Sequence, residues 1–303
     1  MNIKIKGNEN NRKELEKIVQ NNNILHSYLF LGKEGIGKKE IAKEFAKEIL
    51  CLTKKENCNC KSCICFETQN HPDIQIINEE SETIKISQVR DMIQTVYEKP
   101  ILSNKKIYII NDSDKMTKEA QNSLLKTLEE PPEYIIIILI ASNSDMILNT
   151  IKSRCTKIVF DKLTNQEIQE ILTTKDIENT NISENMYELF DGSISKTLKI
   201  LEKKDKYIQL NNFVNEINES SKLDFITQNK EMFEKEEINE LLEYCIVLLF
   251  NLGKKEKNIK YFNCIKIIEE TINKIKSNSN FDMSIDNMLF KLWEEVNEEN
   301  CRN

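Results

Sequence analysis

Tyr28-Leu29-Phe30-Leu31-Gly32-Lys33-Glu34-Gly35-Ile36-Gly37-Lys38-Lys39 is the stretch that decides the fold. An apolar strand leads into Gly-x-x-x-x-Gly-Lys, the pattern of a loop whose backbone N–H groups wrap phosphate. The next position ordinarily carries Ser or Thr, whose hydroxyl ligates the magnesium ion of a bound nucleotide. Here that position is Lys39, so the stretch predicts a nucleotide-binding ancestry with part of the chemistry lost.

Strand and helix patterns alternate around this loop. Apolar strands are expected at 24–31, 74–77, 106–110, 134–141 and 156–160, and helices at 12–22, at 38–50, from Ser87 to Tyr97 and after a Thr117 cap. The nearly all-apolar run 134–141 is typical of a strand buried on both faces. This alternation predicts an α/β fold with a parallel sheet and helices on both faces. After Phe160 only helical patterns follow, beginning with a Thr164 cap, so the rest is expected to be all-α.

Composition excludes several classes of protein. The 303 residues carry a net charge of −7, which argues against a chain that grips DNA by itself, because phosphate neutralisation dominates such binding. No apolar run has the length of a membrane span, and the N-terminus lacks the apolar core of a signal peptide. We therefore expect a cytoplasmic protein without a membrane partner. Nine cysteines in a reducing compartment favour metal binding or burial over disulfides.

Several motifs occur in a recognisable order. They are His26-Ser27-Tyr28-Leu29-Phe30 before the loop, a cysteine cluster, His71-Pro72-Asp73, Ile109-Ile110-Asn111-Asp112-Ser113-Asp114-Lys115-Met116, Asn122-Ser123-Leu124-Leu125-Lys126-Thr127-Leu128-Glu129-Glu130-Pro131-Pro132 and Ile151-Lys152-Ser153-Arg154-Cys155. Together they resemble the AAA+ clamp-loader family, densely over residues 24–160. The resemblance implies a RecA-like AAA+ domain at 1–160 with a Cys-rich zinc module inserted at 51–65. A small helical lid at 161–204 and a C-terminal helical collar, for oligomerisation, at 205–303 would follow.

Within that family the chain most resembles a catalytically silent, stator-like member. The resemblance implies a subunit of the clamp loader of bacterial DNA polymerase III, which acts in DNA replication. Its partners would be the motor (tau/gamma) subunits and the delta subunit in a heteropentameric ring. That ring opens a sliding clamp and places it on primer-template DNA.

Three positions depart from a working ATPase of this family. Lys39 replaces the magnesium hydroxyl, Asn111 replaces the first carboxylate of Asp-Glu after a strand, and Ser195 replaces a sensor arginine in Gly-Ser-x-Arg. Catalysis of phosphoryl transfer is mostly positioning and electrostatics, so each loss costs rate. We expect no intrinsic enzyme activity.

Nucleotide binding is a separate question. Gly32, Gly35, Gly37, Lys38 and Lys39 retain the form of an anion site at a helix N-terminus. An empty structural loop is the alternative, and bound ATP or ADP is doubtful.

Arg154 is the candidate catalytic residue. A lone arginine at the start of a strand is most often a solvated surface charge. In the Ser-Arg-Cys context, the family implies an arginine finger that acts in trans on a neighbouring subunit's ATP site. A guanidinium suits that role, because its rigid fork of donors matches a phosphate.

The cysteine cluster predicts a structural zinc ion. Five thiols lie in fifteen residues, and four thiolates close a tetrahedral site. The assigned ligands are Cys51, Cys58, Cys60 and Cys63, with Cys65 as the substitute, because Cys58-Asn59-Cys60 is one residue shorter than the family's spacing. A degenerate module without metal is the alternative. His71 is expected to be a structural turn residue, although it is close enough in sequence to be a ligand.

Two other functions stay open at this point. One is an active clamp-loader ATPase, against which the three lost positions argue. The other is a zinc-dependent nucleic-acid-binding module, against which the acidic charge and the lack of a basic, aromatic patch argue.

Overall fold

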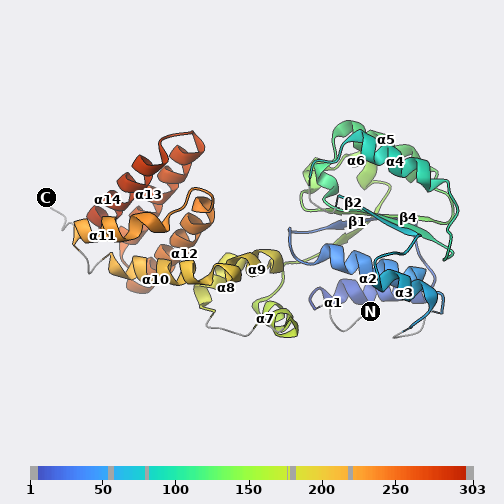
Figure 1. The fold of residues 1–303 in the computed structure, drawn as a ribbon, viewed down its shortest axis with the longest axis horizontal. Helices are drawn as coiled ribbons and strands as arrows, with labels where there is room; N and C mark the ends of the chain where they lie inside the picture. The colour runs from blue at the N-terminus through green and yellow to red at the C-terminus, as the bar shows by residue number, and fades with distance from the viewer. Residues whose placement is uncertain are drawn as a thin grey trace. The chain divides into compact units, whose positions relative to one another are not determined.

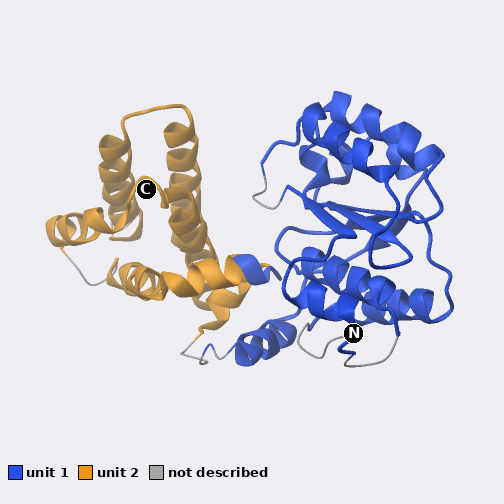
Figure 2. Ribbon diagram, turned by 45° about the vertical axis from the view of Figure 1, so that its right-hand side comes forward, with its two compact units in different colours: residues 1–179, 192–195 blue, residues 180–191, 196–303 orange. Residues whose placement is uncertain are grey.

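The computed structural model describes residues 6–53, 58–78, 82–175, 177, 182–217 and 221–297. The chain divides into two compact units (Figure 2). The first holds residues 1–179 and 192–195, and the second holds residues 180–191 and 196–303. The three-domain division at 1–160, 161–204 and 205–303 stays a prediction.

A five-stranded parallel sheet forms the centre of the first unit, as the alternating pattern predicts. Its strands are β1 (Ser27–Leu31), β2 (Ile74–Ile77), β3 (Lys106–Ile110), β4 (Ile135–Ala141) and β5 (Thr156–Val159). Their order is β2-β3-β4-β1-β5, and every neighbouring pair is parallel. All residues of β3 and β4 are buried, because helices cover both faces of the sheet.

Helices lie on both faces of this sheet (Figure 1). One face carries α1 (Glu9–Gln20), α2 (Lys38–Leu50) and α3 (Lys61–Glu67), and the other carries α4 (Ile86–Val96), α5 (Lys118–Glu129) and α6 (Asn149–Lys152). Short 3-10 turns η1 (Ser113–Lys115) and η2 (Ser144–Met146) follow β3 and β4. Between β1 and α2, the rings of Tyr28 and Phe45 pack edge to face with centroids 5.1 Å apart. The α/β fold class is confirmed.

Helix starts test the predicted caps. Thr117 accepts a hydrogen bond from the backbone N–H of Ala120, and Thr164 forms a capping box with Glu167 at the start of α7 (Asn165–Thr174). The Ser87 cap is wrong, because α4 begins at Ile86. There the Gln88 side chain accepts from the backbone N–H of Lys85.

The second unit is helical, which confirms the all-α part of the predicted fold. It contains α8 (Glu184–Phe190), α10 (Lys204–Glu216), α11 (Lys222–Asn229), η3 (Lys230–Met232), α12 (Ile238–Glu256), α13 (Ile259–Lys276) and α14 (Phe281–Asn297), with most of α9 (Ile194–Glu202). Tyr207 and Tyr244 pack edge to face between α10 and α12, and Phe213 stacks on Phe225 between α10 and α11. Among the described residues, no helix combines the length and the apolar character needed to cross a membrane.

Candidate functional site

The phosphate loop joins β1 to α2 at the carboxyl edge of the sheet. Gly35 and Gly37 have φ values of 76° and 93°, in the left-handed region that a side chain disfavours. Gly37 is the N-cap residue of α2, so Lys38 and Lys39 are the first two residues of that helix. The sequence pattern therefore does form a loop that ends at a helix N-terminus, where anions bind well.

Lys38 turns back onto its own loop. Its Nζ donates to the carbonyl oxygen of Gly32, to that of Lys33 at 2.5 Å and to Ser142 Oγ at 3.2 Å. The side chain is buried, and this desolvation lowers its pKa to about 8, although Asp112 among other acids opposes the shift. Protein oxygen atoms thus surround the Lys38 ammonium, which is the group that would contact the phosphate of a bound nucleotide.

Asn111 and Asp112 stand directly after β3. The Asn111 amide donates from Nδ2 to the carbonyl oxygen of Asn78, 3.3 Å away, and Asn78 Nδ2 returns a bond to the Asn111 carbonyl at 3.2 Å. Asp112 adopts the left-handed conformation, and its Oδ2 lies 3.3 Å from Lys115 Nζ. The Asn111 amide is thus bound to Asn78, the residue after β2. Asp112, the one carboxylate of the pair, forms an ion pair with Lys115.

Residues 192–195 cover the phosphate loop within the first unit. The backbone N–H of Ser195 donates to the Gly35 carbonyl oxygen at 3.3 Å. A Cβ atom at Gly35 would lie 2.2 Å from Ser193 Oγ and 2.8 Å from Ser195 Cβ. Ser195 therefore lies against the loop, where it brings a hydroxyl and a backbone amide and no guanidinium.

Arg154 lies at the opposite edge of the sheet. It stands between α6 and β5, and its carbonyl oxygen accepts a hydrogen bond of 2.7 Å from the hydroxyl of Ser27, the first residue of β1. Gly32 follows the other end of β1, so at 3.3 Å per residue Ser27 and Gly32 are separated by about 16 Å. The Arg154 side chain is 34% exposed, and its Nη2 lies 2.5 Å from Glu129 Oε1. The backbone of Arg154 therefore lies at the end of β1 that is remote from the phosphate loop of its own chain.

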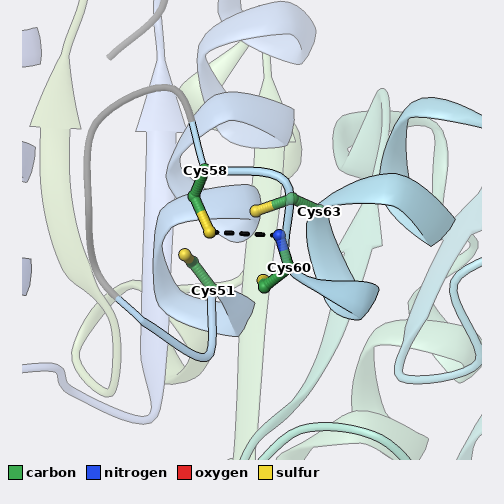
Figure 3. A group of neighbouring side chains, drawn as sticks. All are labelled: Cys51, Cys58, Cys60 and Cys63. Atoms are coloured by element: carbon green, nitrogen blue, oxygen red, sulfur yellow. Dashed lines mark hydrogen bonds between the residues drawn. The ribbon is translucent and has the colours of Figure 1, made fainter.

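Four cysteines converge beside α2 and α3 (Figure 3). The sulfur atoms of Cys51, Cys58, Cys60 and Cys63 all lie within 4.8 Å of one another. A tetrahedral zinc–thiolate site, with bonds of 2.3 Å, has sulfur–sulfur edges of about 3.8 Å, so this group could hold a metal ion. Cys65, the substitute ligand, is outside the group; residues 54–57 of the module lie outside the described part of the chain.

Hydrogen bonds around the cluster favour thiolate at one member. Burial raises the pKa of Cys60, but bonds from the backbone of Cys63 and Leu52 and from neighbouring thiols outweigh it and lower that pKa to about 6. The backbone N–H of Cys60 itself donates to Cys58 Sγ at 3.2 Å. N–H donors to sulfur stabilise the thiolate form, and hydrogen-bond partners of this kind commonly orient metal ligands.

His71 and Asp73 tie this module to the sheet. His71 Nδ1 accepts from the backbone N–H of Asp73 at 3.1 Å, so the proton of a neutral ring lies on Nε2, which is 2.9 Å from Ser62 Oγ. Ser62 Oγ donates to the Leu50 carbonyl at 2.8 Å. Burial lowers the pKa of His71, against the opposing charge of Asp73. Because both ring nitrogens have protein partners, the expected structural role fits this geometry better than a metal-ligand role.

Asp73 has a role that the sequence did not indicate. Its carboxylate is fully buried and accepts three backbone N–H bonds, from Ile101 at 2.6 Å, Leu102 at 2.8 Å and Ser103 at 2.7 Å. Ser103 Oγ in turn donates to the same Leu50 carbonyl that binds Ser62. The available signals were its place in the His71-Pro72-Asp73 motif and its position directly before β2.

Comparisons with known proteins agree with the motifs. A family model described as DNA polymerase III, delta subunit, matches residues 7–164. The DNA polymerase III subunit delta' of Bacillus subtilis is 31% identical over 262 residues, which cover 82% of this chain and 79% of that protein. The subunit tau of the same organism is 33% identical over 204 residues, covering 65% of this chain and 36% of that protein.

A solved structure supports the fold alone. A DNA polymerase III gamma subunit-related protein from Thermotoga maritima matches 94% of this chain and 99% of its own length, with a TM-score of 0.52 at 18% identity. The predicted resemblance is therefore confirmed by an independent family match and by a long alignment. The chain belongs to the delta-prime family of DNA polymerase III clamp-loader proteins.

Proposed function

We propose that this chain is a non-catalytic, stator-like subunit of a DNA polymerase III clamp loader. It joins the motor (tau/gamma) subunits and a delta subunit in a heteropentameric ring that loads a sliding clamp on primed DNA. In that ring it supplies Arg154 in trans, as an arginine finger, to the ATP site of a neighbouring subunit. The observation that carries this proposal is the placement of Arg154. Its side chain is about one third exposed, its backbone is anchored to Ser27, and it lies at the end of the sheet opposite the phosphate loop of its own chain.

The loss of intrinsic ATP hydrolysis follows from the contents of the loop. A magnesium ion between the β- and γ-phosphates needs a hydroxyl and a carboxylate, and Lys39 and Asn111 stand in those places. The Asn111 amide is bound to the end of β2, and Lys38 is bound to carbonyl oxygens of the loop. We infer that the loop is retained for its shape, and that a phosphate would enter only by displacing Lys38 from those oxygens.

Cys51, Cys58, Cys60 and Cys63 would hold a structural zinc ion. The four thiols are free of disulfides and their sulfur atoms gather in one place, which fits the donor set of a closed tetrahedral site. Cys51 follows the last residue of α2 and Cys60 precedes α3, so bound zinc would join the ends of two helices on one face of the sheet. The ion then has a role in folding and none in the reaction.

Reconstitution tests the trans role. Arg154→Ala, assembled with motor and delta subunits, should lower DNA-stimulated ATP hydrolysis by roughly 10³-fold at the one site that it serves, the range seen for arginine fingers. Arg90→Ala is the matched control, since Arg90 is an exposed arginine on α4 of the same unit. Unchanged hydrolysis with Arg154→Ala would refute the finger. ATP turnover by the chain alone would instead favour a motor subunit, and a shift of DNA by the chain alone would favour a nucleic-acid-binding module.

A further inference from the structure

Three protein oxygens hold the Arg154 guanidinium. Nη1 donates to the Thr150 carbonyl at 2.8 Å and to Ser153 Oγ at 3.4 Å, and Nη2 lies 2.5 Å from Glu129 Oε1. Thr150 and Ser153 belong to α6 and the residue after it, whereas Glu129 is the last residue of α5. A contact between two helices that are separate in sequence therefore sets the direction of this side chain.

Glu129 is poorly placed for the stability of its own helix. The C-terminus of a helix carries partial negative charge from its unpaired carbonyls, so an acidic side chain in the last turn is disfavoured. The chain leaves the helix immediately afterwards at Glu130 and Pro131. The ion pair with Arg154 offsets that repulsion, and it gives Glu129 a partner whose position depends on α6.

The contacts leave donors for a further anion. A guanidinium has five N–H donors. The hydrogen bonds to Thr150 and Ser153 use the two donors on Nη1, and Glu129 forms an ion pair with Nη2. The donors on Nε and Nη2 are not used in these two hydrogen bonds, and two donors are enough for a bidentate bond to phosphate. Glu129 can remain paired with Arg154 while the arginine binds the phosphate of a nucleotide held by another subunit.

We propose that Glu129 is a positioning residue that pre-orients Arg154 toward the ATP site of the neighbouring subunit; this inference rests on the proposed trans role of Arg154. A free arginine side chain samples many rotamers, and their loss opposes each productive contact. The carboxylate restricts those rotamers before the neighbour docks. Because Glu129 is itself 49% exposed, the ion pair is a weak one, and its removal should lower kcat roughly fivefold rather than abolish it.

A double-mutant cycle tests this in the reconstituted loader. Glu129→Ala should lower kcat for DNA-stimulated ATP hydrolysis roughly fivefold with KM for ATP unchanged, and Glu129→Gln, which keeps a neutral acceptor, should lie between Glu129→Ala and wild type. Adding Glu129→Ala to Arg154→Ala should change nothing further, because Glu129 acts only through Arg154. Glu130→Ala is the matched control, since Glu130 is an exposed acid on the same turn.

Each outcome has one meaning. A normal kcat with Glu129→Ala, while Arg154→Ala is impaired, overturns the positioning role and leaves the proposed function standing. A loss from Glu129→Ala that is equally large without Arg154 shows a general structural effect and also overturns it. If Arg154→Ala has no effect, the proposed function fails, and the positioning role fails with it. Glu129→Gln keeps the test valid if Glu129→Ala does not assemble.

Discussion

Replacing Asp73 with alanine should loosen the loop 101–103 and destabilise the first unit. The fully buried carboxylate accepts three backbone N–H bonds of 2.6–2.8 Å. A hydrogen bond to a charged group is worth about 1.5–3 kcal/mol, so three give an upper range of about 4.5–9 kcal/mol. The net loss is smaller, because Asp73→Ala also removes the cost of burying a charge and because Ile101 is an exposed residue. We expect about 3–5 kcal/mol.

Hydrogen exchange measures this effect at the residues concerned. In the wild-type protein the amides of Ile101, Leu102 and Ser103 should exchange slowly, and in Asp73→Ala they should lose their protection. At about 2–4 °C for each kcal/mol in a unit of this size, the melting temperature of the first unit should fall by roughly 6–20 °C. Asp91→Ala is the control, since Asp91 is exposed on α4, and it should change stability by less than about 0.5 kcal/mol.

Two results would refute the reasoning about Asp73. The first is fast exchange of the amides 101–103 in the wild-type protein, which would mean that the three bonds do not hold the loop. The second is a melting temperature of Asp73→Ala equal to that of Asp91→Ala. A lowered melting temperature with full protection of these amides would place the effect elsewhere in the unit.

Two further predictions concern the candidate sites. Purified protein should carry about one equivalent of zinc; Cys63→Ser should lose it and Cys65→Ser should keep it, as metal analysis and thiol titration would tell, and equal zinc content in both would contradict the four-cysteine site. Burial lowers the pKa of Lys38 from 10.5 to about 8, so the folded protein releases the Lys38 proton at a lower pH than the unfolded chain does. The cost of burying the charged ammonium is present in full below about pH 8 and disappears as the pH rises to 10.5. Over that interval, 2.5 pKa units at 1.36 kcal/mol each, the free energy of unfolding should rise by roughly 3 kcal/mol relative to Lys38→Met; parallel pH profiles in denaturant titrations would contradict this.

Local patterns predicted the elements well, because their signals lie within a few residues. The all-apolar β4 and the capping residues Thr117 and Thr164 are examples, since burial on both faces and an N-cap hydroxyl leave a direct mark on the sequence. The prediction of a Ser87 cap was wrong, although it rested on the same kind of local signal. A serine near a helix start is a good cap in general, but Gln88 reached back to the Lys85 amide one turn earlier.

The candidate sites show the same division between what the sequence determined and what the structure determined. The sequence alone determined which functional groups are present: Lys39, Asn111 and Ser195 are visible as losses because a hydroxyl, a carboxylate or a guanidinium is either encoded or not. Only the tertiary structure decided what those groups contact. Its long-range contacts place Arg154 at the edge opposite its own loop and against Glu129.

The cysteine module and its anchor make the same point. The sequence offered five thiols, of which four were assigned as ligands with Cys65 as the substitute, and the fold gathers those four and leaves Cys65 outside the group. It also turns Asp73 inward to bind the loop at 101–103, nearly thirty residues away. Such contacts join segments that are distant in the chain, so no short pattern records them. Residue types set what chemistry is possible here, and the packing of the sheet and its helices sets where it is exercised.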